Sequence, residues 1–242
     1  MQKQLLEYLK SLKAFLSSNL EKYNNKLPYI IATIIALIIF VGGIKIFIEL
    51  TDSLKTDLLS NYDMQITKVL VDYRTPALTK YFVTATDVGD VWGYLVVFSL
   101  CVALFYLIFK SWKYVAQIAM VMVLAMSSNL FLKQLINRAR PDAEHLVTVE
   151  TLSYPSGHAM IAMAFYGFLV YLVYQFKINK VLKFALMVFL VLLILSIGIS
   201  RVYLGVHFPS DVAGGYIAGF IWVVFCIMIF NLIKIFRRDA ET

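Results

Sequence analysis

Three short polar clusters, each flanked by apolar residues, hold the side chains of this chain that could do chemistry. They span residues 133–141, 155–158 and 200–211. Ionisable groups beside a membrane core are energetically costly, so their presence there indicates a function. Together the clusters supply three spaced cations, two histidines and one well-placed carboxylate. Phosphoryl chemistry without a metal requires this combination of groups.

Positive charge for the oxygens of a phosphate group comes from Lys133, Arg140 and Arg201. Arginine binds phosphoryl oxygens in a bidentate manner, whereas lysine acts as a point charge. Ser156 and Gly157 stand just before an expected helix, where free backbone N–H groups and the helix dipole favour an anion. We therefore expect these five residues to bind a phosphate group.

The two histidines of these clusters can divide the catalytic work. A histidine nucleophile attacks through a neutral ring nitrogen and needs an acceptor at its other nitrogen. Asp211 stands four residues after His207, a spacing that places both on one face of a helix, although Pro209 makes a turn equally possible. His158 is then the expected general acid, which protonates the departing oxygen and later activates water.

Composition indicates that most of the chain lies in a bilayer. Of its 242 residues, 61% are hydrophobic and 15% are charged, and the mean hydropathy is +0.78. A water-soluble domain of this length could not bury so much apolar surface. The net charge of +7 comes from lysines at helix ends, which are typical of membrane topology rather than of nucleic-acid binding. Cys101 and Cys226 lie inside apolar runs and are expected to be buried thiols.

Six apolar stretches are long enough to cross the hydrocarbon core as helices. They cover approximately residues 29–49, 91–109, 114–135, 158–176, 182–200 and 212–236. We therefore predict an all-α, integral-membrane six-helix bundle that forms one domain over residues 1–242. Apolar stripes at helical spacing predict an amphipathic segment on the cytoplasmic surface over residues 1–27. Similar stripes predict short helices over residues 51–90, which either lie on the outer leaflet or pack over the bundle.

The distribution of lysine and arginine predicts the orientation. Cations gather before the first span, between the second and third, between the fourth and fifth, and after the sixth. By the positive-inside rule this side is cytoplasmic, both termini lie there, and the three clusters meet at the outer face of the cell membrane. The cations of the cytoplasmic side are Lys3, Lys10, Lys13, Lys22, Lys26, Lys110, Lys113, Lys177, Lys180, Lys183, Lys234, Arg237 and Arg238.

The remaining charged residues near the clusters have simpler explanations. Arg138 lies between the fixed positions of the first cluster and is expected to be a surface cation whose side chain reaches water. His145 is expected to be a solvated loop residue. Six aspartates in residues 51–90 are expected to balance the four cations of that segment.

The three clusters together resemble the three-part signature of the type 2 phosphatidic acid phosphatase superfamily. The matching residues are Lys133-x6-Arg140-Pro141, Pro155-Ser156-Gly157-His158 and Ser200-Arg201-x5-His207-x3-Asp211. The resemblance implies a metal-independent membrane lipid phosphatase without a cofactor. It implies that His207 is the nucleophile, His158 the acid and Asp211 the residue that orients the nucleophile. The implied phosphate ligands are Lys133, Arg140, Ser156, Gly157 and Arg201.

In length and layout the chain is similar to the bacterial phosphatidylglycerophosphatase B-type members of this superfamily. The implied partners are the bilayer and a lipid phosphate such as phosphatidylglycerophosphate, undecaprenyl pyrophosphate or phosphatidic acid, and no nucleic acid. The headgroup, the preference for a mono- or diphosphate and the oligomeric state are open. Alternatives are a lipid phosphotransferase with the same phosphohistidine and a catalytically silent lipid-binding or transport protein. A vanadate-dependent haloperoxidase shares the phosphate-site residues, but its soluble nature argues against it.

Overall fold

The computed structural model describes Glu7 and residues 27–110, 112–142, 144–149 and 151–240. The described part of the chain folds into helices joined by turns and loops, without a strand. The helices are α2 (Leu27–Ser53), α3 (Asp57–Asp72), α4 (Pro76–Val88), α5 (Val91–Phe109), α6 (Lys113–Ile136), α7 (Gly157–Gln175), α8 (Lys180–Tyr203) and α9 (Pro209–Ala240). The predicted cytoplasmic segment, residues 1–27, lies outside the described residues apart from its Glu7 and Leu27.

Six of these helices, α2 and α5 to α9, are long and apolar enough to cross a membrane. Their outer faces carry large exposed apolar side chains, such as Ile38 and Val41 of α2 and Phe184 of α8. A bilayer covers such a surface, since its hydrocarbon core accommodates helices of about 20 apolar residues. The prediction of an all-α protein with six spans is therefore confirmed.

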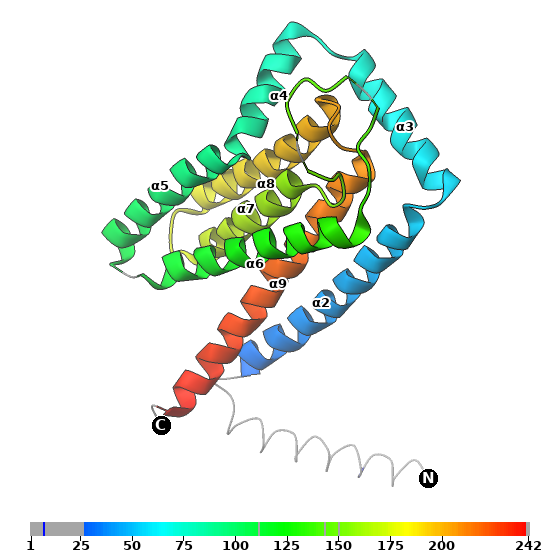
Figure 1. Ribbon diagram of the computed structural model, residues 1–242. Helices are drawn as coiled ribbons and strands as arrows, with labels where there is room; N and C mark the ends of the chain where they lie inside the picture. Colours follow the sequence, from blue (N-terminus) through cyan, green and yellow to red (C-terminus); the bar gives the residue numbers. More distant parts are fainter. Residues whose placement is uncertain (1–6, 8–26, 111, 143, 150, 241–242) are drawn as a thin grey trace.

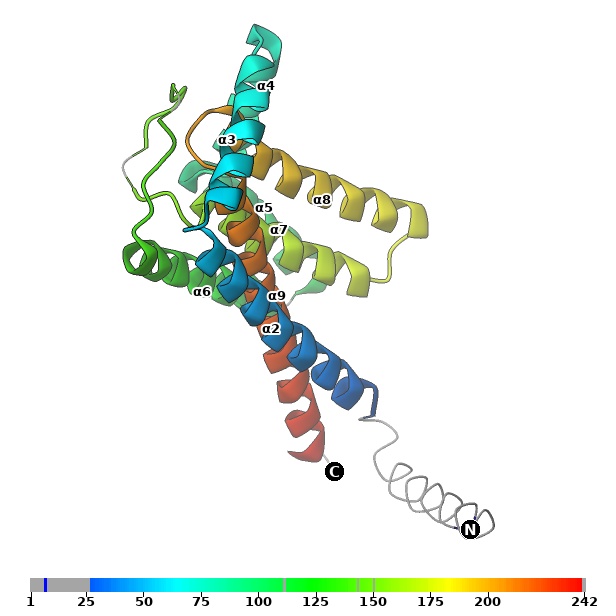
Figure 2. The ribbon, with the colours of Figure 1, turned by 90° about the vertical axis from the view of Figure 1, so that its right-hand side faces the viewer.

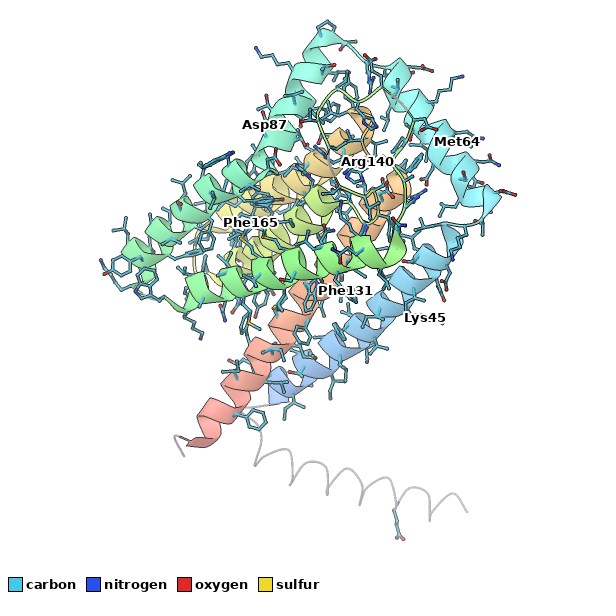
Figure 3. The ribbon with its side chains drawn as sticks, viewed as in Figure 1. Lys45, Met64, Asp87, Phe131, Arg140 and Phe165 are labelled. Carbon is cyan, nitrogen blue, oxygen red and sulfur yellow. The ribbon has the colours of Figure 1, made fainter. Side chains whose placement is uncertain are left out.

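Helix α7 forms the centre of the bundle and packs against α6, α8 and α9. Its Phe165 and Phe168 are fully buried, and Figure 3 shows Phe165 in the interior between the helices. Helix α2 packs along α9, and the two leave the bundle side by side (Figures 1 and 2). Helix α5 lies at the edge, next to α4 and α6. The short, buried α7 thus brings its first turn into contact with several other segments.

Small residues let α9 lie close to α7. A Cβ atom added at Gly215 would come within 2.6 Å of the carbonyl oxygen of Ser156, and one at Gly219 within 2.4 Å of that of Met160. Helices in lipid associate through such close packing, because lipid tails give them no hydrophobic reason to pair. The contact places the start of α9 against the residue before α7, where the Ser156 N–H donates to the Asp211 carbonyl at 3.0 Å.

Two short helices, α3 and α4, cross one end of the bundle, beside the loop that joins α6 to α7 (Figure 1). Thr56 and Thr75 cap them by accepting the N–H groups of Leu59 and Leu78, as hydroxyl residues often do. Residues 51–90 therefore contain short helices, as predicted.

The exposure of individual side chains shows which face of α3 is buried. Ile66, Val69 and Tyr73 of its apolar stripe are exposed, whereas Asp63 and Thr67 are buried. The helix therefore presents a polar face to the bundle and an apolar face outward, where lipid would cover it.

The close contact between α7 and α9 leads to a first prediction. Gly215→Val should lower the free energy of unfolding by about 1–3 kcal/mol, because the added side chain presses on the Ser156 carbonyl. The melting temperature of the purified protein in detergent measures this loss. Gly42→Val in α2 is the matched control, since a Cβ there meets no described atom within 4 Å. Equal melting temperatures for the two variants would contradict the prediction.

Candidate active site

A cavity of about 1020 Å³ lies at the end of the bundle that α3 and α4 cross. Figure 3 shows Arg140 pointing from the loop after α6 toward the interior at this end. Ser156 and Asp211 are fully buried and lie directly behind the cavity wall. The other residues predicted from the three clusters all line it: Lys133, Arg140, Gly157, His158, Arg201 and His207.

The three cations reach the cavity from three different segments. Lys133 comes from the last turn of α6, and its Nζ donates to Oγ1 of Thr151 at 2.9 Å. Arg140 comes from the following loop, and its Nε donates to the Thr151 carbonyl at 2.6 Å. Arg201 comes from the last turn of α8 and donates to Oγ1 of Thr86. These acceptors are uncharged, so the positive charges stay available for an anion in the cavity.

The hydrogen bonds around the His207 ring determine its tautomer. The Ser153 hydroxyl donates its proton to Oδ2 of Asp211, so it can only accept from His207 Nδ1, which lies 3.4 Å away. Arg140 has donors but no acceptors, so its contact with Nε2 at 3.3 Å requires a lone pair on Nε2. The neutral ring therefore carries its proton on Nδ1 and presents an unprotonated Nε2.

Burial keeps the His207 ring neutral. Removal of the ring from water lowers the pKa of His207 to about 3, although the nearby Asp211 acts in the opposite direction. At neutral pH Nε2 therefore carries a lone pair rather than a proton, and this lone pair can attack an electrophile that takes the place of the Arg140 N–H.

Asp211 lies behind the His207 ring and is held from several directions. Its Oδ2 lies 3.5 Å from His207 Nδ1 and accepts the Phe208 N–H at 2.7 Å, while Oδ1 accepts from Arg138 at 2.6 Å. His207 lies in the turn before α9 and Asp211 lies in its first turn. Of the two arrangements left open by the sequence, the structure has the turn.

His158 lies in the first turn of α7, and its Nε2 is 3.2 Å from Oδ1 of Asp90. Asp90 is the exposed residue that precedes α5, and its side chain makes no capping hydrogen bond to that helix. The neighbouring His158 ring lowers the pKa of the Asp90 carboxyl below its usual value. Nε2 of His158 makes no hydrogen bond of normal geometry to a described residue. An ionised carboxylate at this distance only accepts, so it favours the tautomer with the proton on Nε2, and His158 lines the cavity.

Ser156 and Gly157 differ in what they can offer a ligand. The expectation of a free N–H at Ser156 is wrong, because close packing of α9 engages it with the Asp211 carbonyl. Its hydroxyl is buried and has no hydrogen-bond partner within the described part of the chain. At Gly157 a Cβ would come within 2.9 Å of Oδ1 of Asn129, a buried α6 residue that donates to the Pro155 carbonyl. Only glycine fits this position without displacing Asn129.

Several residues of the site were missed or misread in the sequence. The surface position expected for Arg138 is wrong, because only 16% of its side chain is exposed and it pairs with Asp63 and Asp211. Asp63 and Asp90 also do more than balance charge in residues 51–90. The sequence did not indicate these pairings, because the partners of Asp63 and Asp90 are more than 60 positions away in the chain. Ser153 could have been suspected from its place beside the second cluster.

The cavity continues from the cations into an apolar section between α5 and α6. Its walls there include Leu95 and Phe98 of α5 and Met122, Val123 and Met126 of α6. Such a lining suits hydrocarbon and is typical of sites that fix a ligand with a few polar groups. The described residues contain no group of three or more His, Cys, Asp or Glu side chains that could hold a metal ion.

Comparisons with known proteins agree with this geometry. Residues 114–234 match the family model of the PAP2 superfamily. Phosphatidylglycerophosphatase B of Bacillus subtilis (strain 168) is 31% identical over 201 residues, which cover 81% of this chain and 93% of that protein. The crystal structure of a transmembrane PAP2 type phosphatidylglycerolphosphate phosphatase from Bacillus subtilis has a TM-score of 0.73 and 30% identity, covering 79% of this chain and 95% of its own. Aquifex aeolicus LpxE shares the fold, with a TM-score of 0.54 and 22% identity over 70% of this chain and 93% of its own.

The depressed pKa of His207 predicts a pH dependence of stability. Between the ordinary value of 6.5 and about 3, the unfolded chain binds a proton at His207 that the folded protein does not. Stability should therefore fall as the pH is lowered through this range, and His207→Gln should weaken the decline. Melting temperatures at pH 7 and at lower pH measure it, with the loop variant His145→Gln as control. An equal decline in all three proteins would contradict the prediction.

Proposed function

This chain belongs to the PAP2 superfamily as an integral-membrane lipid phosphate phosphatase, and we propose that it acts on phosphatidylglycerophosphate or a closely related lipid phosphomonoester. The observation that carries the proposal is the arrangement around one cavity. An unprotonated Nε2 of His207 lies in the same cavity as three cations, a protonated Nε2 of His158 and an apolar section. The cavity thus has a place for each part of a lipid phosphate.

The phosphate group binds among Lys133, Arg140 and Arg201 in the proposed reaction. These fixed cations neutralise the charge that spreads over the non-bridging oxygens in the transition state, and they need no reorganisation to do so. The first N–H groups of α7, beginning with that of Gly157, lack intrahelical partners, and because Gly157 and His158 line the cavity, these donors also serve the phosphate in the proposal. The unpaired hydroxyl of Ser156 is a further donor in the proposal.

Two proton transfers complete the proposed cycle. His207 Nε2 forms a bond to phosphorus while the bond from phosphorus to the lipid oxygen breaks, and His158 gives its Nε2 proton to that oxygen. Asp211 and Ser153 hold the Nδ1 proton and stabilise the ring as it becomes positively charged. Water then attacks phosphorus, His158 takes a proton from it, and the bond from His207 to phosphorus breaks. Inorganic phosphate leaves, and both histidines return to their starting states.

The cavity rim favours a phosphomonoester over a diphosphate. Asp87 and Asp90 line it, and Asp90 contacts the acid that protonates the leaving oxygen. In a diphosphate that oxygen belongs to a second charged phosphate, which two nearby carboxylates would repel. In phosphatidylglycerophosphate it belongs to a glycerol carbon. The Bacillus subtilis protein and the Bacillus subtilis crystal structure that resemble this chain are both named for this substrate.

We also propose that one domain, residues 1–242, carries the activity and that its site opens at the outer face of the cell membrane. Support comes from the cations at the opposite end of the bundle. Lys110 follows α5 and Lys113 begins α6, while Lys177 follows α7 and Lys180 and Lys183 lie in the first turn of α8. By the positive-inside rule, that end and both termini face the cytoplasm.

A panel of lipid substrates tests the proposed function. Purified protein should release phosphate faster from phosphatidylglycerophosphate and phosphatidic acid than from undecaprenyl pyrophosphate. His207→Ala should reduce the rate by at least about 10³-fold, because no phosphohistidine can form. His145→Ala, a loop histidine outside the cavity lining, is the control. Phosphate transfer to an added alcohol without release would favour a phosphotransferase, and no turnover of any lipid would favour a silent binding protein.

Removal of divalent metals tests the charge arrangement. The positive charge in the proposed site comes from Lys133, Arg140 and Arg201, so excess EDTA should leave kcat unchanged. Loss of turnover with EDTA, followed by recovery on addition of a divalent ion, would contradict the proposed mechanism.

A further inference from the structure

A second charged cluster lies behind the proposed nucleophile, and no hydrogen bond or ion pair among the described residues joins it to Lys133, Arg140 or Arg201. It consists of Asp63 of α3, Arg138 of the loop after α6, and Ser210 and Asp211 of α9. Asp63 is 2% exposed and Asp211 is not exposed at all. Two buried carboxylates thus share one guanidinium group, an arrangement that is stable only when each charge is paired and hydrogen-bonded.

Asp63 caps the helix that carries Asp211. Its Oδ1 accepts the backbone N–H of Ser210 at 2.9 Å, and its Oδ2 accepts the Ser210 hydroxyl. Ser210 is the second residue of α9, where a backbone N–H has no partner within the helix. A carboxylate from α3, 147 positions earlier in the chain, therefore performs the role that a neighbouring Ser or Asp usually performs.

Arg138 connects the two carboxylates. Its Nη2 donates to Oδ2 of Asp63 at 2.8 Å, and its Nη1 donates to Oδ1 of Asp211 at 2.6 Å. The same Nη1 lies 2.7 Å from the Ser210 hydroxyl, and the guanidinium stacks on Phe208 at 4.5 Å from the ring centre. A planar group with contacts at both ends and on one face has little freedom to rotate.

The cluster ends at the His207 ring. With Oδ1 of Asp211 held by Arg138, Oδ2 is directed to Ser153 and to Nδ1 of His207. We propose that Asp63 and Arg138 are positioning residues, which fix Asp211 and thereby aim the attacking Nε2 of His207 at phosphorus. This inference rests on the proposed function, because it needs His207 as the nucleophile. It assigns the outer helix α3 a part in the reaction, through the one carboxylate on its buried face.

Asp63→Asn separates the charge of Asp63 from its capping role. The amide oxygen can still accept the Ser210 N–H, so the cap on α9 is retained. The amide nitrogen replaces Oδ2 and faces Nη2 of Arg138 with a donor, so Arg138 loses one of its two anchors. Asp72→Asn is the matched control, since Asp72 lies on the same helix and is exposed.

The test compares kcat, KM and phosphoenzyme formation in these variants. Asp63→Asn should lower kcat and the single-turnover rate of phosphoenzyme formation by about tenfold to 100-fold, the range expected when a reacting group is misplaced by about 1 Å. KM should change by less than about threefold, because the phosphate ligands are untouched. Asp72→Asn should match the wild type.

Arg138 gives a second, independent variant. Arg138→Lys keeps the charge but cannot reach both carboxylates, so it should cause a loss of kcat similar to that of Asp63→Asn. If both residues act through Asp211, kcat of the double variant should be only slightly lower than kcat of the more impaired single variant.

Two outcomes separate this inference from the function on which it rests. Wild-type kcat in either folded variant, with only a lower melting temperature, would make the cluster structural and overturn the inference alone. A wild-type protein that releases phosphate from no lipid would overturn the proposed function and, with it, the role of Asp63.

Discussion

Burial of the Asp211 carboxylate is the interaction on which the rest of the site depends. A fully buried negative charge is tolerated only when its oxygens are filled by donors. Here the donors come from the loop after α6, the segment before α7 and the turn before α9, as Arg138, Ser153 and the Phe208 N–H. Satisfying one carboxylate therefore joins the first and third polar clusters to the residues just before the second, although the spans α7 and α8 separate the second cluster from the third in the sequence.

The sequence predicted the six spans and the grouping of the clusters well, because both depend on simple physical rules. Apolar length determines which segments cross a bilayer, and the alternation of spans then decides which ends meet. The misread residues have a common cause. A single aspartate on an amphipathic helix ordinarily faces water, so Asp63 gave no sign that α3 turns its polar face inward. Arg138 was misread for the same reason, since its partner was not recognised.

The arrangement of His207 and Asp211 could not be predicted from their spacing alone. The four-residue interval between His207 and Asp211 suits a helix, yet Pro209 starts α9 only after the histidine. The tautomer of the ring depends on Ser153 and Arg140, neither of which follows from that interval. Hydrogen-bond partners distant in the chain, rather than residue type, determine which nitrogen of His207 can react.

The division of the cavity into a charged end and an apolar section has a consequence for how such a protein can diverge. The residues proposed for the chemistry lie at the ends of α6 to α9 and in the loops beside them, whereas Leu95, Phe98, Met122 and Met126 lie deeper along α5 and α6. Substitutions in the deeper set change the shape offered to a hydrocarbon chain without touching an ionisable group. Natural selection can therefore adjust the preferred lipid tail and the hydrolytic machinery independently of each other.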